Sequence, residues 1–186
     1  MFKRINVANI IRDHLKTLKR IDTVGKGMSS ADFCLFFLLP MFIAGVLVSQ
    51  DIHLEKHITD LITSISILGG FLFNLLAIVY GLMDKLQADA KKSIDGKPNL
   101  KATFVKEIHT NISFNIVASL LILFLLLVLS FMNGRNVCVL CINRYCSITI
   151  LNIVQGLTWL IYSLLGTFSL TMLMILNRIY ILLNKG

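Results

Sequence analysis

The sequence predicts an all-α membrane protein with four transmembrane helices. Hydrophobic residues make up 56% of the 186 residues and charged residues only 15%, which is far more apolar than a soluble domain of this size. Charged residues are also absent from four long segments and collect between them. Basic residues, finally, are distributed very unevenly over the connecting segments. These observations define a polytopic membrane protein.

Four uncharged runs define the expected spans. They are 18, 23, 27 and 33 residues long and cover residues 33–50, 61–83, 108–134 and 145–177. A helix rises about 1.5 Å per residue, so about 20 apolar residues cross a hydrocarbon core of about 30 Å. We therefore expect spans at 33–50, 61–83, 108–132 and 147–170. The last run is longer than one crossing needs, which favours a helical exit from the membrane over two short pieces broken near Gly156.

The orientation follows from the basic residues. Fifteen of the 18 lysines and arginines lie in residues 1–32, 84–107 and 178–186, and three lie in residues 51–60 and 133–146. Because cytoplasmic loops carry the excess of basic residues, we expect both termini inside and the two poorer segments as external loops, in a bacterial inner membrane. The net charge of +8 is then mainly a topology signal plus attraction to anionic lipid, with no direct binding of nucleic acid implied.

Residues 1–32 form a separate basic segment that precedes the four-helix domain of residues 33–186. Within it, residues 5–21 predict an amphipathic helix with Val7, Ile11, Ile21 and either Leu15 or Leu18 on the apolar face. The opposite face carries Arg12, Lys16, Lys19 and Arg20. Such a helix either lies on the inner leaflet or docks on a cytosolic partner.

The segment 84–107 predicts a helical hairpin that projects into the cytosol. The second span continues through MDKLQADAKKS, the chain turns at DGKPN, and Asn99 can cap a new helix that starts LKATFVKEI. This stem is the second candidate for contact with a partner or with lipid, through Lys85, Lys91 and Lys92.

Small and polar residues recur at helical spacing inside three spans. The second span has Ser66, Gly70 and Asn74, the third has Asn111, Asn115 and Ser119, and the fourth has Asn152 and Gln155. These residue types pack helices together in lipid, so we expect the stripes to face protein, with the lining of a pore in an oligomer as the alternative. No Asp, Glu, Lys or Arg lies inside a span, which argues against a proton-coupled transporter or an intramembrane metal site.

Three of the four cysteines lie in the short stretch CVLCINRYC, as Cys138, Cys141 and Cys146. In an oxidising compartment they can form a disulfide or perform thiol exchange. A zinc site would need His53 or His57 as a further ligand. We favour a structural turn, oxidised or free, and predict no metal and no cofactor.

CVLC followed by Arg144 resembles the first motif of the DsbB family of quinone-dependent thiol oxidoreductases. That family places the motif after its first span and has a second cysteine pair in the other external loop. Here the motif follows the third span, and DIHLEKHITD contains no cysteine. The four histidines, His14, His53, His57 and His109, are scattered and form no triad with a nucleophile, so each is expected at a surface or interface and the chain is not expected to be an enzyme.

SILGGFLFNLLAIVYGLMDKL, EIHTNISFNIVASLL and TFSLTMLMILNRIYILLNKG resemble small four-span membrane proteins of bacterial anti-phage defence, in particular the membrane subunit of the Kiwa system. The resemblance covers size, topology and the character of spans two to four. It implies an oligomeric inner-membrane sensor of phage attack that acts on a cytosolic effector. A pore-forming, holin-like effector and a DsbB-like thiol oxidoreductase are the two alternatives.

Overall fold

The computed structural model describes residues 7–18, 34–50, 54–92, 100–134 and 144–184, and in these ranges every regular element is a helix. The predicted all-α class is confirmed. The five α-helices are α1 (Val7–Thr17), α3 (Leu39–Ser49), α4 (Ile58–Lys92), α5 (Leu100–Gly134) and α6 (Arg144–Asn184). A π-helical turn, Cys34–Leu38, precedes α3, and a 3₁₀ turn, Leu54–His57, precedes α4.

Three helices are long and apolar enough to cross a membrane, over Ile58–Leu86, Lys101–Met132 and Ile153–Asn184. The apolar stretch Cys34–Ser49 is shorter, and at about 1.5 Å per residue it measures about 24 Å. α4 and α5, of 35 residues each, measure about 52 Å, well beyond the core thickness of about 30 Å. α4 continues to Lys92, past the uncharged run 61–83, and α5 begins at Leu100, before the uncharged run 108–134, so both helices extend at the end where the stem was expected.

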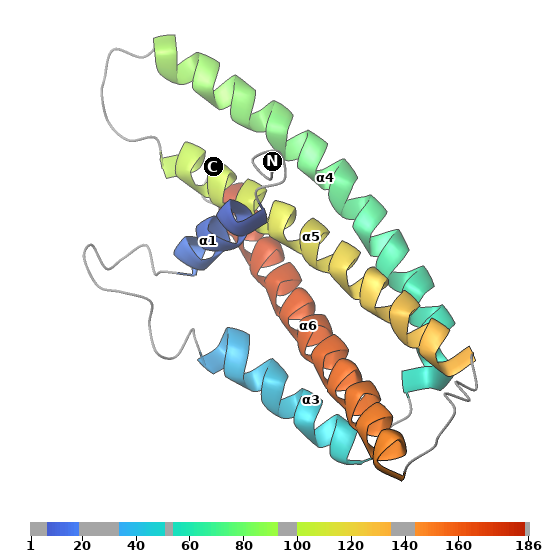
Figure 1. Cartoon of the computed structure of the whole chain (residues 1–186). Helices are drawn as coiled ribbons and strands as arrows, with labels where there is room; N and C mark the ends of the chain where they lie inside the picture. The colour runs from blue at the N-terminus through green and yellow to red at the C-terminus, as the bar shows by residue number, and fades with distance from the viewer. Residues whose placement is uncertain (1–6, 19–33, 51–53, 93–99, 135–143, 185–186) are drawn as a thin grey trace.

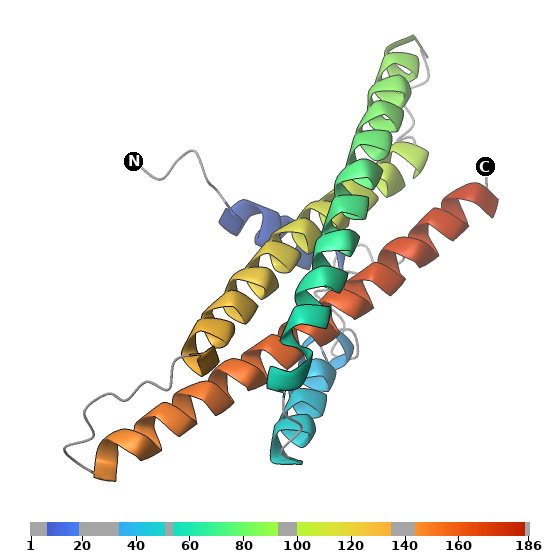
Figure 2. The same cartoon turned by 90° about the vertical axis from the view of Figure 1, so that its right-hand side faces the viewer.

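The three long helices and α3 lie side by side in the order α4, α5, α6 and α3, and the two views agree on this arrangement (Figures 1 and 2). α5 is central because it packs against α4 on one side and against α6 on the other, and it also carries α1. α3 packs on α6. α6 is continuous through Gly156, so the alternative of two pieces broken at that glycine is wrong.

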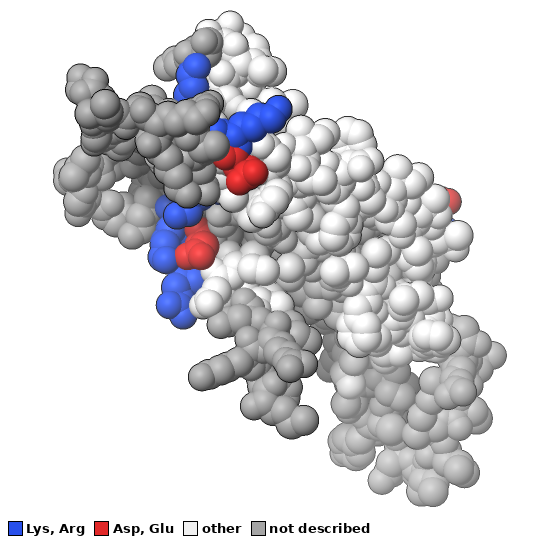
Figure 3. All heavy atoms as spheres, turned by 90° about the horizontal axis from the view of Figure 1, so that it is seen from above, with Lys and Arg blue, Asp and Glu red and all other residues white. Residues whose placement is uncertain are grey.

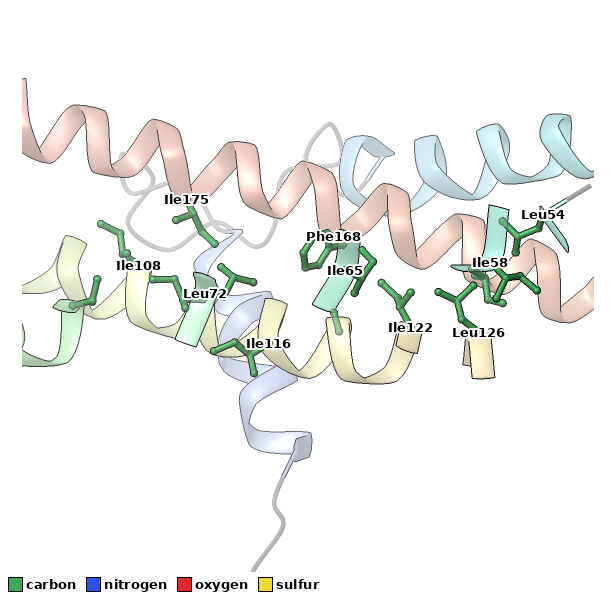
Figure 4. Packing of buried hydrophobic residues seen from close by; sticks show 14 of the residues in the cluster. Leu54, Ile58, Ile65, Leu72, Ile108, Ile116, Ile122, Leu126, Phe168 and Ile175 are labelled. Atoms are coloured by element: carbon green, nitrogen blue, oxygen red, sulfur yellow. The ribbon is translucent and has the colours of Figure 1, made fainter. Parts of the chain in front are cut away.

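The core is a row of aliphatic side chains between α4, α5 and α6 (Figure 4). α5 contributes Ile108, Ile112, Ile122 and Leu126, which recur at helical spacing and are at most 1% exposed. Many large apolar side chains on the outer faces are exposed, for example Phe71 at 65%. Lipid is as apolar as these side chains, so the helices are held together by close packing and by hydrogen bonds rather than by the exclusion of water.

The crossing of α3 and α6 depends on a proline and a glycine. Pro40 has no N–H and stands in the first turn of α3, directly after the π-helical turn Cys34–Leu38. Pro40 in turn lies against Gly166, where an added Cβ would be 2.9 Å from the Pro40 Cβ. Only a glycine lets the two helices approach this closely.

α1 packs on α5 of its own chain, where the sequence suggested the membrane surface or a partner (Figure 1). The buried residues of α1 are His14 and Thr17, and Leu18 directly after the helix is also buried. The burial of Leu18 agrees with the predicted apolar face, whereas Ile11, which was placed on the same face, is 41% exposed. The buried face of α1 thus coincides only in part with the predicted one. The surface to which it docks presents polar partners, and these select the polar residues of α1.

Candidate functional site at the junction of α1, α5 and α6

A buried polar cluster joins α1 to α5 and α6. His14 and Thr17 lie one turn apart on α1 and both contact Asn111 of α5. The His14 Nδ1 and Asn111 Oδ1 atoms are 2.9 Å apart, and the Thr17 Oγ1 is 2.7 Å from the same amide oxygen. Asn111 is 0% exposed and His14 is 2% exposed. These contacts hold α1 in a single register on α5.

The orientation of the Asn111 amide and the tautomer of His14 are linked. With Oδ1 toward α1, His14 must carry a proton on Nδ1 in order to donate to Asn111. The Thr17 hydroxyl has a single proton and two acceptors, the Asn111 Oδ1 and the His14 carbonyl oxygen, each 2.7 Å from the Thr17 Oγ1. In this arrangement the Asn111 Nδ2 has no partner among the described residues. With the amide turned over, Nδ2 donates to both His14 and Thr17, and the Thr17 proton goes to the carbonyl. The second arrangement needs a neutral imidazole, because Nδ1 is then the acceptor, whereas in the first arrangement Nδ1 donates in either protonation state.

The neutral imidazole is also favoured by its surroundings. The ring of His14 stacks on Phe114, with the ring centroids 3.8 Å apart and the planes 4° from parallel. Burial lowers the pKa of His14 below its ordinary value of 6.5, and the charge of Arg178 lowers it further, against the opposing effect of the hydrogen bond to Asn111. His14 is therefore uncharged at neutral pH, and it lies at the interface between α1 and α5 and not at the surface.

Arg178 of α6 closes the cluster from the other side. Its Nη2 donates to the backbone carbonyl of Thr17 at 2.6 Å, which satisfies one of the free carbonyls at the C-terminal end of α1. Its Nη1 lies 2.9 Å from Glu107 Oε2 as an ion pair, although the atoms are not aligned as a hydrogen bond. The two side chains are 11% and 18% exposed. Arg178 thus binds α1, α5 and α6 together.

A polar cleft of about 300 Å³ opens beside this cluster, between one face of α1 and one face of α5. Its lining contains two basic side chains, two acidic side chains and three hydroxyls, from Asp13, Lys16, Thr17, Thr103, Lys106, Glu107 and Thr110. On α1, Lys16 donates to Asp13 at 2.7 Å, and this contact holds the pKa of the Asp13 carboxyl below its usual value. The side chains of Lys, Arg, Asp and Glu gather at this end of the molecule (Figure 3).

Those predicted contact residues that the structure describes lie at the same end of the molecule as the cleft. Arg12, Lys16 and Lys85 are exposed. Lys91 and Lys92 belong to the last turn of α4, and their side chains lie outside the described part of the chain, as do Lys19 and Arg20 entirely.

The stripe on α5 is buried against the rest of the chain. Asn115 is 0% exposed and donates to the Phe168 carbonyl of α6 at 3.4 Å, and Ser119 donates to the Ile116 carbonyl of its own helix at 2.8 Å. An added Cβ on Gly69 of α4 would lie 3.3 Å from the Ser119 hydroxyl. In this single chain the α5 stripe thus joins helices and faces no lumen.

The stripe on α4 lies beside the face of that helix that packs against α5, and not on it. The buried face contains Ile65, Gly69 and Leu72, whereas the predicted residues Ser66, Gly70 and Asn74 are all exposed. Within this chain, the prediction that these three residues pack against another helix is wrong. Contact with a second chain stays a prediction for them. On α6, Gln155 is exposed and the side chain of Asn152 is not described.

The cysteines of the CVLCINRYC stretch lie largely outside the described residues. Cys138 and Cys141 are not described, and Cys146 belongs to the first turn of α6 without a described side chain. The described ranges contain no group of three His, Cys, Asp or Glu residues placed to hold a metal ion. His57 is exposed, and His53 is not described.

Sequence reasoning placed Asn111 in a stripe but missed its partners. Glu107 and Arg178 border the third and fourth uncharged runs, and this shared position at a span boundary was a usable signal for an ion pair. No comparable signal existed for His14 and Thr17, since they lie 97 and 94 positions from Asn111 along the chain.

Comparison with known protein families, curated proteins and solved structures finds no match to this chain. What the structure defines is a class, that of helical proteins with at least three helices able to cross a membrane. The particular role has to be argued from the junction of α1, α5 and α6.

Proposed function

We propose that this protein is a four-span inner-membrane sensor or scaffold, with both termini in the cytosol, that couples an event in the membrane to a cytosolic effector without catalysis of its own. The observation that supports the proposal most is the junction of α1 with α5 and α6. A helix outside the spans is tied by buried polar contacts to two helices able to cross the membrane. A shift between α5 and α6 would therefore move α1.

The proposed orientation rests on the basic residues. The junction lies at the end of α5 and α6 that adjoins the segments rich in lysine and arginine, so it faces the cytosol under the rule for positive charge. Arg12 and Lys16 are exposed, which makes them accessible to a partner. The resemblance to the membrane subunit of the Kiwa system implies that this membrane event is phage attack.

Assembly from several copies is supported by the exposed stripe on α4. Asn74 lies near the middle of the second uncharged run, is exposed, and makes no hydrogen bond to another described residue. An amide in hydrocarbon without a partner is unfavourable, and Ser66 and Gly70 would let a second helix approach closely on the same face. A second copy of this chain supplies such a helix.

The coupling is tested by recovering the partner from the native host. Reversing the charges at Arg12 and Lys16, with Lys19 and Arg20, is expected to abolish recovery of the cytosolic partner while membrane insertion and the oligomer persist. Lys56→Glu is the matched control, because Lys56 is exposed but lies before α4 at the opposite end of the chain's long helices. Recovery of the same partner in equal amount by the charge-reversed protein would overturn the proposal.

A further inference from the structure

The cleft between α1 and α5 lies at the level where the apolar parts of the long helices end. The third uncharged run begins directly after Glu107, and the fourth ends directly before Arg178. These two residues form an ion pair at 2.9 Å, so the two boundaries meet at one level of the structure. Glu107 also lines the cleft. If the helices span a membrane as proposed above, the cleft opens at the depth of the phospholipid headgroups.

The charge in the cleft is mixed rather than of one sign. α1 contributes Asp13 and Lys16, and α5 contributes Lys106 and Glu107. A purely anionic group would have to approach two carboxylates, and a purely cationic group would have to approach two ammonium groups. A ligand with a positive and a negative part can satisfy both sets at once.

Free hydrogen-bonding capacity is available on both sides of the cleft. Lys106 forms no ion pair among the described residues, and the hydroxyl of Thr103, one turn away on the same face of α5, makes no hydrogen bond there. The two could receive a phosphate oxygen together. Across the cleft, Asp13 forms its one ion pair within the described part of the chain with the neighbouring Lys16, and both side chains are more than half exposed. An exposed pair of this kind is weak and exchanges partners readily.

The size of the cleft suits a small headgroup. Its volume of about 300 Å³ is at the lower end of the range of about 300–1,000 Å³ that is typical of small-molecule sites. That is room for a phosphate and a short amino-alcohol, while the acyl chains would remain among the exposed apolar side chains of the helices.

We propose that this cleft binds the headgroup of a zwitterionic aminophospholipid, with the phosphate on Lys106 and Thr103 and the primary ammonium on Asp13 and Glu107. The inference deepens the proposed function because it rests on the membrane placement stated there. A lipid bound in this way bridges α1 and α5, and the docking of α1 becomes sensitive to the lipid that surrounds the protein. This is a specific site, distinct from general attraction of the exposed basic residues to anionic lipid.

The test is native mass spectrometry of the purified full-length protein, released from nanodiscs that contain equal amounts of phosphatidylethanolamine, phosphatidylcholine and phosphatidylglycerol with the same acyl chains. Retention of phosphatidylethanolamine is expected to exceed that of the other two. Phosphatidylcholine has no N–H to donate to a carboxylate, and phosphatidylglycerol has no cation. Equal retention of the three lipids, or preference for phosphatidylglycerol, would overturn the proposal.

Two variants and one control assign the binding to the cleft. Lys106→Gln and Asp13→Asn each remove one charged hydrogen bond and should weaken retention of phosphatidylethanolamine about tenfold. Both residues are exposed, so the fold should tolerate the changes. Lys85→Gln, an exposed lysine on α4 near the same end, should retain the lipid as the unmodified chain does. Unchanged retention in Lys106→Gln would also overturn the assignment.

A last experiment distinguishes a bound lipid from a soluble molecule with the same headgroup. O-phosphoethanolamine at millimolar concentration should fail to displace the bound lipid, because it lacks the acyl chains. Displacement at micromolar concentration would overturn the assignment to a lipid. These readouts do not depend on the cytosolic partner, so a failed partner experiment and a failed lipid experiment are told apart.

Discussion

Replacing Asn111 with leucine should release α1 from α5. The substitution keeps a similar volume but removes the amide that contacts both His14 Nδ1 at 2.9 Å and Thr17 Oγ1 at 2.7 Å. Thr17 retains its hydrogen bond to the His14 carbonyl, whereas the buried imidazole loses its partner. One net hydrogen bond plus one unsatisfied buried nitrogen amounts to a cost of about 2–4 kcal/mol for the docked state.

Hydrogen–deuterium exchange over residues 7–17 measures this cost. An isolated helix of 11 residues is marginal in water, so released α1 exchanges like a coil. A loss of about 2 kcal/mol corresponds to exchange that is about 30 times faster. Gln155→Leu, which replaces an exposed amide more than 20 residues before Arg178 on α6, is the matched control and should leave the exchange of α1 unchanged. Equal exchange in the two variants would refute the idea that Asn111 anchors α1.

Further perturbations probe the same junction and the crossing of α3 with α6. Since the pKa of His14 is lowered by docking, the released state binds more protons, so docking should be strongest above pH 6.5 and weaken as the pH falls below it. The readout is a lower protection factor of α1, which compares the observed exchange with intrinsic amide exchange at the same pH. A protection factor that does not change with pH would contradict the buried neutral imidazole. Arg178→Ala should likewise accelerate exchange of the last turn of α1, and unaltered protection there would exclude the capping contact. Gly166→Ala forces a Cβ to 2.9 Å from Pro40 and should destabilise the helix crossing by about 1–3 kcal/mol, measured as a lower midpoint of thermal unfolding. Gly156→Ala, which meets nothing within 4 Å, should not lower that midpoint.

The sequence was sufficient to predict the helical class and the position of the long helices. The excess of apolar residues and the charge-free runs are direct consequences of the need to satisfy backbone groups inside a bilayer. α4 and α5 also continue past their apolar runs, as capping and turn residues suggested. What connects the helices was harder to predict.

The face of α4 that packs against α5 shows why the contacts between helices are hard to predict from the sequence. Both sides of this helix are apolar in the middle, because one side meets α5 and the other is free to meet lipid, so periodicity alone does not choose between Gly69 and Gly70. Close approach to Ser119 identifies Gly69, and only the structure contains that contact.

The register of α1 illustrates a second limit. A pattern of apolar and charged residues predicts which face is buried only when the surface that it meets is apolar. Here α1 meets an amide and an arginine that come from far along the chain, with Thr17 and Arg178 separated by 161 positions. The polar side chains His14 and Thr17 therefore take the buried positions, and Ile11 is left exposed.

The proposed role as a coupling protein is tested most directly by native mass spectrometry of complexes released gently from the membranes of the native host, with each complex dissociated and its components identified in the same run. The prediction is a complex with several copies of the 20.9 kDa chain and a cytosolic protein that is lost when the basic residues of α1 are reversed. A single chain with no bound protein would contradict both the assembly and the coupling.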